Sequence, residues 1–330
     1  MTLRAFCPGH VTCFFSPGRR EDPLESGSRG VGFVMDSGAT AEVSERPDSR
    51  IEITLNGEPS DACVTRFACG LLAPGRGFDI SIENPLPLGQ GFGTSASGTV
   101  AAMMCIASIV GATDEDALRV SHISEVVNGG GLGDVCGMIP GSGFSVREEA
   151  GFPPHGRCSA LDLAHGKFTV AVVGPPISTA SVINGSTAQL ISDVGAGCID
   201  RFMANQSMAM LFACSNQFSA AAGLEGPHVK RAARLLSFRR YNWGMCMLGN
   251  SIFTDAPEDV VREVAGPDAF VMTVEPGGRP REMLRIRVIH GNPDICKPIA
   301  PIRYGYRPAV QPQFRPIWAL YTAVRIPLRL

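Results

Sequence analysis

Hydrophobic and polar residues alternate in several segments of the first eighty residues. Segments 51–55 and 78–83 place an apolar side chain at every second position, as strands do when one face covers a core and the other meets water. Segment 30–35 is mostly apolar and is entered from a glycine turn, which favours a third strand. We therefore expect the beginning of the chain to be β-structure.

The period of the pattern changes after Ser95. Residues 96–111 are small or apolar on nearly every side, which predicts a buried helix rather than an amphipathic one. Thr113 has the properties of an N-cap, and the acidic residues at 114–116 would occupy the first turn of a second helix, where negative charge suits the helix dipole. That helix is expected to end near residue 127, before an asparagine and three glycines.

The second half of the chain mixes strand and helix patterns. Segment 168–173 predicts a strand that ends at a Gly-Pro-Pro sequence, and segments 269–274 and 284–289 predict a pair of strands around a Pro-Gly-Gly turn. Helical patterns lie between them, at about 198–222, 227–238 and 257–264. Strands first, then helices, then a mixed second half predict an α+β fold in two lobes.

We place the N-terminal lobe at 1–166 and the C-terminal lobe at 167–296. The remaining segment, 297–330, has no acidic residue, several prolines and arginines, and no clear period. It is interpreted as a disordered or loosely docked tail, with a basic tail for an acidic partner as the alternative.

Composition is typical of a globular protein with a substantial core. The 330 residues are 45% hydrophobic and 18% charged, and the net charge of −2 gives no reason to expect nucleic acid or an anionic membrane as partner. Lys167, Lys230 and Lys297 are the only lysines. Phosphate chemistry in the first half of the chain must therefore use backbone amides, arginine or a metal ion.

The eleven cysteines are scattered and form no Cys-x-x-Cys pair, which favours buried reduced thiols over a disulfide scaffold or a zinc site. The N-terminus lacks the apolar region of a signal peptide, and the longest apolar stretch, 100–110, is too short to span a bilayer. The sequence predicts a cytoplasmic protein without a membrane partner.

A glycine-rich segment, 87–98, lies between a predicted strand and the predicted buried helix. Gly89, Gly91 and Gly93 allow the backbone to approach a ligand closely and to point successive N–H groups into one concavity. The following helix N-terminus favours a polyphosphate, and Thr94 and Ser95 add hydroxyl groups. The spacing fits neither the Walker loop, nor the dinucleotide fingerprint, nor the nucleophile elbow, and the alternative is a tight connection without a ligand.

Three motifs carry a resemblance to the GHMP kinases, the group that contains galactokinase, homoserine kinase and mevalonate kinase. Segment 87–96 resembles the signature Pro-x-x-x-Gly-Leu-Gly-Ser-Ser-Ala, with Phe92 in place of leucine and Thr94 in place of the first serine. Pro8-Gly9-His10 resembles the N-terminal substrate motif, and 244–253 resembles the C-terminal glycine motif. The resemblance implies a two-lobed GHMP kinase fold, with an N-terminal lobe like ribosomal protein S5 domain 2 and a ferredoxin-like C-terminal lobe.

Within the group, residues 4–290 are most similar to the archaeal pantoate kinases of coenzyme A biosynthesis. This resemblance implies ATP and Mg²⁺ as cofactors, the small molecule pantoate as substrate, and a homodimer. It implies Asp134 as catalytic base, and Ser95 and Glu125 as magnesium ligands. The phosphate loop that would hold ATP comprises Pro87, Gly89, Gly91, Gly93, Thr94, Ser95, Ala96 and Ser97.

Pantoate carries a carboxylate, so a guanidinium is its expected partner. Arg147 is the first choice and Arg29 the second, and His10, Ser28 and His122 complete the predicted substrate pocket. The alternatives are another GHMP kinase acting on homoserine, mevalonate or a sugar, and a non-catalytic nucleotide or metabolite sensor on the same fold. A hydrolase is disfavoured because the sequence identifies no oriented base beside a nucleophile.

Overall fold

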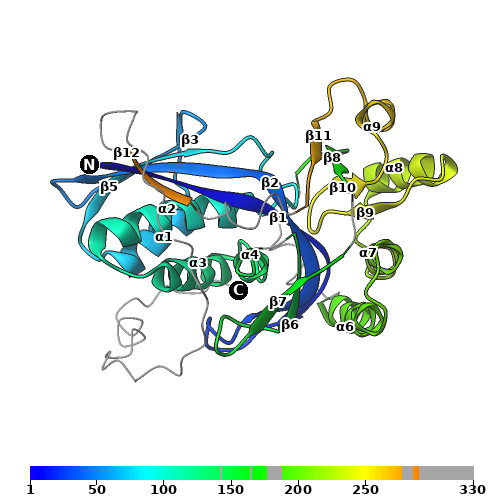
Figure 1. The fold of residues 1–330 in the computed structure, drawn as a ribbon, viewed down its shortest axis with the longest axis horizontal. Helices are drawn as coiled ribbons and strands as arrows, with labels where there is room; N and C mark the ends of the chain where they lie inside the picture. Colours follow the sequence, from blue (N-terminus) through cyan, green and yellow to red (C-terminus); the bar gives the residue numbers. More distant parts are fainter. Residues whose placement is uncertain (142, 164–165, 177–187, 277–284, 290–330) are drawn as a thin grey trace, which may run out of the picture. The chain divides into compact units, whose positions relative to one another are not determined.

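The computed structural model describes residues 1–141, 143–163, 166–176, 188–276 and the backbone of 285–289. The predicted tail, 297–330, lies outside the described residues. The described residues fall in one compact unit, traced in Figure 1.

The larger sheet is built on a long antiparallel hairpin of β1 (Thr2–Gly18) and β2 (Gly27–Arg46). Its main path runs β12-β1-β2-β5-β3-β4, and β6 and β7 extend it from the other half of β2. The remaining strands are β3 (Ile51–Leu55), β4 (Glu58–Pro59), β5 (Gly77–Glu83), β6 (Phe144–Glu149), β7 (Arg157–Leu161) and β12 (Arg285–Ile289). Only the β3–β5 pair is parallel among the described strand pairs of this sheet.

Three helices cover this sheet and form a core with it: α1 (Cys63–Leu72), α2 (Thr94–Val110) and α3 (Asp114–Asn128) (Figure 1). Twelve of the seventeen residues of α2 are buried, as the pattern without a polar face predicted. Thr113 caps α3 as predicted, in a capping box with Asp116. A short helix, α4 (Asp134–Met138), follows.

The smaller sheet has the strand order β11-β8-β10-β9 and is antiparallel throughout. Its strands are β8 (Phe168–Val172), β9 (Trp243–Met245), β10 (Ser251–Thr254) and β11 (Val271–Val274). The helices are α6 (Ala188–Ala204), α7 (Met208–Ala221), α8 (Pro227–Phe238) and α9 (Glu258–Ala265). Counted in chain order the strands lie 4-1-3-2, with helices after the first and third, which is the ferredoxin-like arrangement.

Three predictions about elements were wrong. Helix α1 was missed, because its apolar positions lie within a region whose flanks alternate like strands. Segment 198–222 is not one helix: α6 ends at Ala204, and Ser207 caps α7 by accepting from the N–H of Met210. The last two predicted strands do not pair with each other, because β11 joins β8 and β12 joins β1 in the larger sheet.

One hydrophobic core connects the two sheets. Phe33 on β2 packs edge-on against Phe168 of β8 and Phe253 of β10, with ring centroids 5.3 and 5.4 Å apart. Residues of β1, the strand that pairs with β2 in the hairpin, belong to the same core. A division into lobes at residue 166 stays a prediction, because the buried side chains form a continuous cluster across it.

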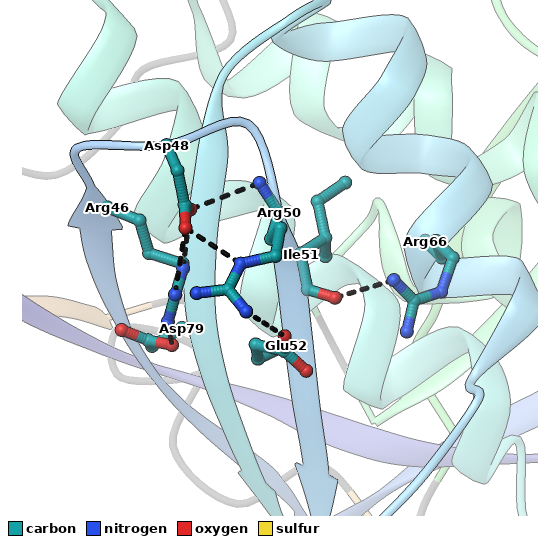
Figure 2. Close-up of polar contacts among 7 residues, drawn as sticks. All are labelled: Arg46, Asp48, Arg50, Ile51, Glu52, Arg66 and Asp79. Atoms are coloured by element: carbon teal, nitrogen blue, oxygen red, sulfur yellow. Dashed lines mark hydrogen bonds and ion pairs between the residues drawn. The ribbon is translucent and has the colours of Figure 1, made fainter.

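A network of ion pairs links the β2–β3 connection to β5 of the larger sheet (Figure 2). Asp48 accepts from the guanidinium groups of Arg46 and Arg50, and Arg46 also reaches Asp79 on β5. These two arginines hold the pKa of Asp48 below its usual range. Arg50 is exposed and Asp48 is partly exposed, so solvent screens these charges and the network contributes little to stability.

Among the described residues, all ten cysteines are free, and eight of them are buried. Within the same part of the chain, none of the helices combines the length and apolar character needed to cross a membrane.

Candidate active site

A cavity of about 190 Å³ lies where the phosphate loop, β1 and the segment before α4 meet. Thr12 and Phe15 of β1 form part of its wall, and Ser28 lies beside them on the neighbouring strand. The β1–β2 register shifts twice near the cavity, between Pro8 and His10 and between Thr12 and Phe14. Such bulges redirect side chains, and here they lie in the strand that passes the site.

The phosphate loop contributes the largest continuous part of the wall. Gly89, Gly91 and Gly93 all have positive φ, at 67°, 74° and 61°, which side-chain-bearing residues adopt with strain. Gly93 is also the N-cap of α2, so the loop passes directly into the helix N-terminus. The backbone therefore presents amide groups and the positive end of the helix dipole to the cavity.

The segment 244–253 supports the loop from behind. A methyl group at Gly91 would lie 2.5 Å from the carbonyl oxygen of Cys246. Ser251 donates its hydroxyl to the carbonyl of Gln90, and the N–H of Met247 bonds the carbonyl of Thr12 at 3.1 Å. The loop therefore has little room to change conformation.

Six of the eight residues predicted to hold ATP line the cavity: Gly89, Gly91, Gly93, Thr94, Ser95 and Ala96. Pro87 and Ser97 do not. Ser97 is buried within α2, where its hydroxyl donates to the carbonyl of Thr94.

Ser95 and Glu125 meet at the cavity although thirty residues separate them. The hydroxyl of Ser95 donates to Oε1 of Glu125 at 2.6 Å, and the glutamate side chain is 3% exposed. Burial raises the pKa of Glu125 to about 7, against the lowering effect of the Ser95 hydroxyl, and nearby Asp134 raises it further. The site therefore disfavours the ionised form of Glu125, and a bound cation would offset this effect.

This pair of oxygen donors fits Mg²⁺. The described residues hold no group of three or more metal-ligating side chains. Magnesium does not need one, because it commonly uses one or two protein oxygens together with substrate phosphates and water. A buried carboxylate with a raised pKa, next to a phosphate loop, is the kind of donor that such an ion would neutralise.

Asp134 begins α4 and faces the cavity. Its Oδ1 lies 2.8 Å from Nδ1 of His10, which is fully buried and does not line the cavity. Burial lowers the pKa of His10, an effect that the hydrogen bond to Asp134 partly offsets. Burial therefore favours an uncharged ring, and Nδ1 can donate to the carboxylate when it carries the ring proton.

Arg147 on β6 has the largest fully buried side chain in the described residues, and it is 1% exposed. Its Nε donates to the carbonyl of Ser28 at 3.2 Å, and Nη2 donates to the hydroxyl of Thr12 at 3.3 Å. Nη1 has no hydrogen-bond partner. Among the described residues no carboxylate lies within ion-pair distance of it, so a buried cation stands directly behind two residues of the cavity wall.

Of the five predicted substrate residues only Ser28 lines the cavity, and Arg29 and His122 lie outside the wall as His10 and Arg147 do. Arg29 is half-exposed, donates to the carbonyl of Glu148 and pairs with Asp200 at 3.1 Å. His122 is buried on α3, where its Nε2 lies 3.1 and 3.0 Å from the carbonyls of Pro23 and Ser26. These contacts account for both side chains without a ligand.

Sequence reasoning missed several residues of the wall. Thr12 lies two positions beyond His10 on β1, so the two side chains share one face of the strand. This spacing could have predicted Thr12 as a residue of the site. Met247 and Leu248 lie inside the segment that resembles the C-terminal glycine motif, for which no wall residue was predicted. Phe15 and Leu132 carried no signal, because an apolar residue in a wall resembles one in a core.

Comparisons with known proteins agree with this geometry. The GHMP kinases N terminal domain matches residues 62–142. A pantoate kinase of Thermococcus kodakarensis is 30% identical over 264 residues, covering 77% of this chain and 87% of that protein. A pantoate kinase of Methanospirillum hungatei is 28% identical, covering 84% and 95%. A solved phosphotransferase related to the CoA biosynthesis pathway has a TM-score of 0.77 at 26% identity, covering 87% of this chain and 98% of that one.

The fold and the cavity define an ATP-dependent small-molecule kinase. The chain belongs to the GHMP kinase family.

Proposed function

We propose that this chain transfers the γ-phosphoryl group of ATP to the 4-hydroxyl of pantoate, forming 4-phosphopantoate for coenzyme A biosynthesis. The observation that carries the choice of substrate is Arg147, a buried cation without a carboxylate partner behind the cavity wall. Pantoate brings a carboxylate, whose negative charge the guanidinium would stabilise from behind the wall residues Thr12 and Ser28. Two relatives named pantoate kinase support the same choice.

The phosphate loop would hold ATP through its amides. Gly89, Gly91 and Gly93 present N–H groups to the cavity, and the N-terminus of α2 adds its dipole, so the loop stabilises negative charge on the transferring group. Ser95 and Glu125 would hold Mg²⁺, which neutralises phosphate charge when bound. The segment 244–253 holds the phosphate loop in one conformation, so the loop does not have to rearrange before the phosphoryl group is transferred.

Asp134 would act as general base. Its carboxylate lies in the cavity wall, and it accepts the hydroxyl proton of pantoate while the new oxygen–phosphorus bond forms. The bond between the γ-phosphorus and the bridging oxygen breaks at the same time, and ADP leaves with the electron pair. Phosphoryl transfer needs mainly positioning and charge neutralisation, and the residues of this cavity supply both.

Thr12 and Ser28 would orient the substrate, because both line the cavity and both are bonded to Arg147. A cytoplasmic location, predicted from the apolar pattern of the sequence, and a homodimer, implied by the family resemblance, complete the proposal.

The test is ADP release by purified protein with MgATP and a panel of D-pantoate, homoserine, mevalonate and galactose. Turnover with pantoate alone, lost in Asp134→Ala, supports the proposal. Turnover with another alcohol of the panel would support the kinase activity but identify a different substrate. Binding of ATP without turnover on any alcohol favours a sensor.

A further inference from the structure

His10 lies behind Asp134 rather than in the cavity. The side chain is fully buried, and Asp134 lines the cavity while His10 does not. The ring reaches Oδ1 of Asp134 through Nδ1 at 2.8 Å, and Oδ2 lies beside Gly131, which belongs to the cavity wall. A ligand in the cavity would therefore meet the aspartate and not the histidine.

Two glycines enclose the far side of the imidazole ring. A methyl group at Gly32 would lie 2.6 Å from Nε2, and one at Gly137 would overlap the ring. Nε2 is buried and has no hydrogen-bond partner. The unprotonated form of Nε2 has the lowest free energy in this environment, because an unpaired buried N–H or a buried charge carries a larger desolvation cost.

The charged groups around the ring are Asp134 and Arg147. Asp134 raises the pKa of His10, whereas Arg147 lowers it, and burial has the largest effect and lowers it. These effects favour a neutral ring, and its one proton can form a hydrogen bond to Asp134 only when it is on Nδ1.

The backbone of His10 links the same residue to the phosphate loop. Its N–H donates to the carbonyl of Phe92 at 3.0 Å, at the strand position where β1 shifts register. One residue thus contacts the loop through its main chain and the base through its side chain.

We propose that His10 is a positioning residue for phosphoryl transfer: its neutral ring donates Nδ1–H to Oδ1 of Asp134 and leaves Oδ2 to meet the substrate hydroxyl. The inference rests on the proposed role of Asp134 as base. Because Nε2 is sealed by Gly32 and Gly137, the ring cannot pass a proton on to water. His10 therefore affects the orientation of the carboxylate rather than the binding of either substrate.

The test compares two substitutions at this position. His10→Asn keeps an N–H donor the same number of bonds from Cβ as Nδ1, whereas His10→Leu has similar size and no donor. His155→Leu is the matched control, because His155 is half-exposed and lies outside the site. For each variant, kcat and both KM values are measured with MgATP and pantoate, and circular dichroism confirms the fold.

We expect His10→Leu to lower kcat about 100-fold, the effect of a misplaced catalytic group, with both KM values within about threefold of wild type. His10→Asn should recover most of the lost kcat, and His155→Leu should match wild type. An unchanged kcat in His10→Leu, or an equal loss in both His10 variants, would overturn the proposal.

A second measurement needs neither activity nor a folded leucine variant. Nitrogen NMR of histidine-labelled wild type, with the His10 signals assigned through His10→Asn, reports the tautomer at neutral pH. We expect a neutral ring protonated at Nδ1, and a ring protonated at Nε2 would refute the hydrogen bond. If wild type phosphorylates no pantoate, the proposed function fails, and the tautomer alone decides whether His10 donates to Asp134.

Discussion

Replacing Glu125 with glutamine should stabilise the metal-free protein at alkaline pH. Burial raises the pKa of this carboxyl group from its ordinary value of 4.5 to about 7. One pKa unit corresponds to about 1.36 kcal/mol, so keeping Glu125 ionised in the folded protein costs roughly 3 kcal/mol. The cost follows from the site: the one hydrogen bond to its side chain comes from Ser95, and no cation lies near it among the described residues.

The sign of the pH dependence follows from the direction of this shift. A carboxyl group whose pKa is raised on folding contributes stability that is fully present below pH 4.5 and is lost as the pH rises through about 7. Glu125→Gln has no such titration. The free energy of unfolding of the variant should therefore exceed that of wild type by up to about 3 kcal/mol at pH 8, and by less than about 1 kcal/mol at pH 5.

The assay is urea unfolding at both pH values, in the presence of a chelator. Glu115→Gln is the matched control, because Glu115 lies on the same helix and is exposed. The free energy of unfolding of the control should differ from that of wild type by a similar small amount at both pH values. Equal pH dependence in wild type and Glu125→Gln, or a less stable Glu125→Gln at pH 8, would refute the reasoning. Kinase activity should be lost in Glu125→Gln in either case.

Three further substitutions test other parts of the site and fold. Arg147→Met should raise the KM for pantoate about 100-fold in steady-state kinetics, because the positive charge that attracts the carboxylate from behind the wall is lost, while Arg29→Ala should leave it within about twofold. Gly91→Ala should weaken ATP binding in calorimetry and lower stability by about 1–2 kcal/mol, because its φ of 74° strains a side-chain-bearing residue. Thr113→Ala should cost about 1 kcal/mol in urea unfolding without changing kcat, since it removes the cap of α3.

Each of these has a contrary outcome. Equal KM effects for the two arginine substitutions would remove the assignment of the carboxylate to Arg147. Full ATP affinity in Gly91→Ala would show that the loop conformation is not required. A fall in kcat in Thr113→Ala would mean that the cap of α3 influences the site.

Much of the local structure could be predicted from the sequence. The buried helix α2 and the capped helix α3 follow from short-range rules, namely an apolar face on every side and an N-cap followed by acids. The glycine-rich loop could be predicted for the same reason, because three alternate glycines before a helix allow the positive φ angles that other residues adopt only with strain.

Long-range pairing was not predictable in the same way. The β11 and β12 segments looked like a hairpin because only a short turn-like sequence separates them. Their partners are β8 and β1. This pairing depends on which apolar faces remain uncovered in the complete fold, and the local sequence does not contain that information.

The site shows the same limit. Sequence resemblance gave Ser95, Glu125 and Asp134, and the structure brings the first two within 2.6 Å of each other. The sequence ranked Arg147 before Arg29 as partner of the carboxylate, but it contained no information on the contacts or burial of either side chain. Burial and the lack of a carboxylate partner separate them, and these are properties of the folded chain.

The most direct test of the account follows a radiolabelled γ-phosphate from ATP into pantoate with wild type and Asp134→Asn. The account predicts labelled 4-phosphopantoate from wild type and a rate about 1,000-fold lower in the variant, the scale of a general base, with MgATP affinity within about threefold of wild type. Label that never reaches pantoate although ATP binds, or undiminished transfer in Asp134→Asn, would contradict it.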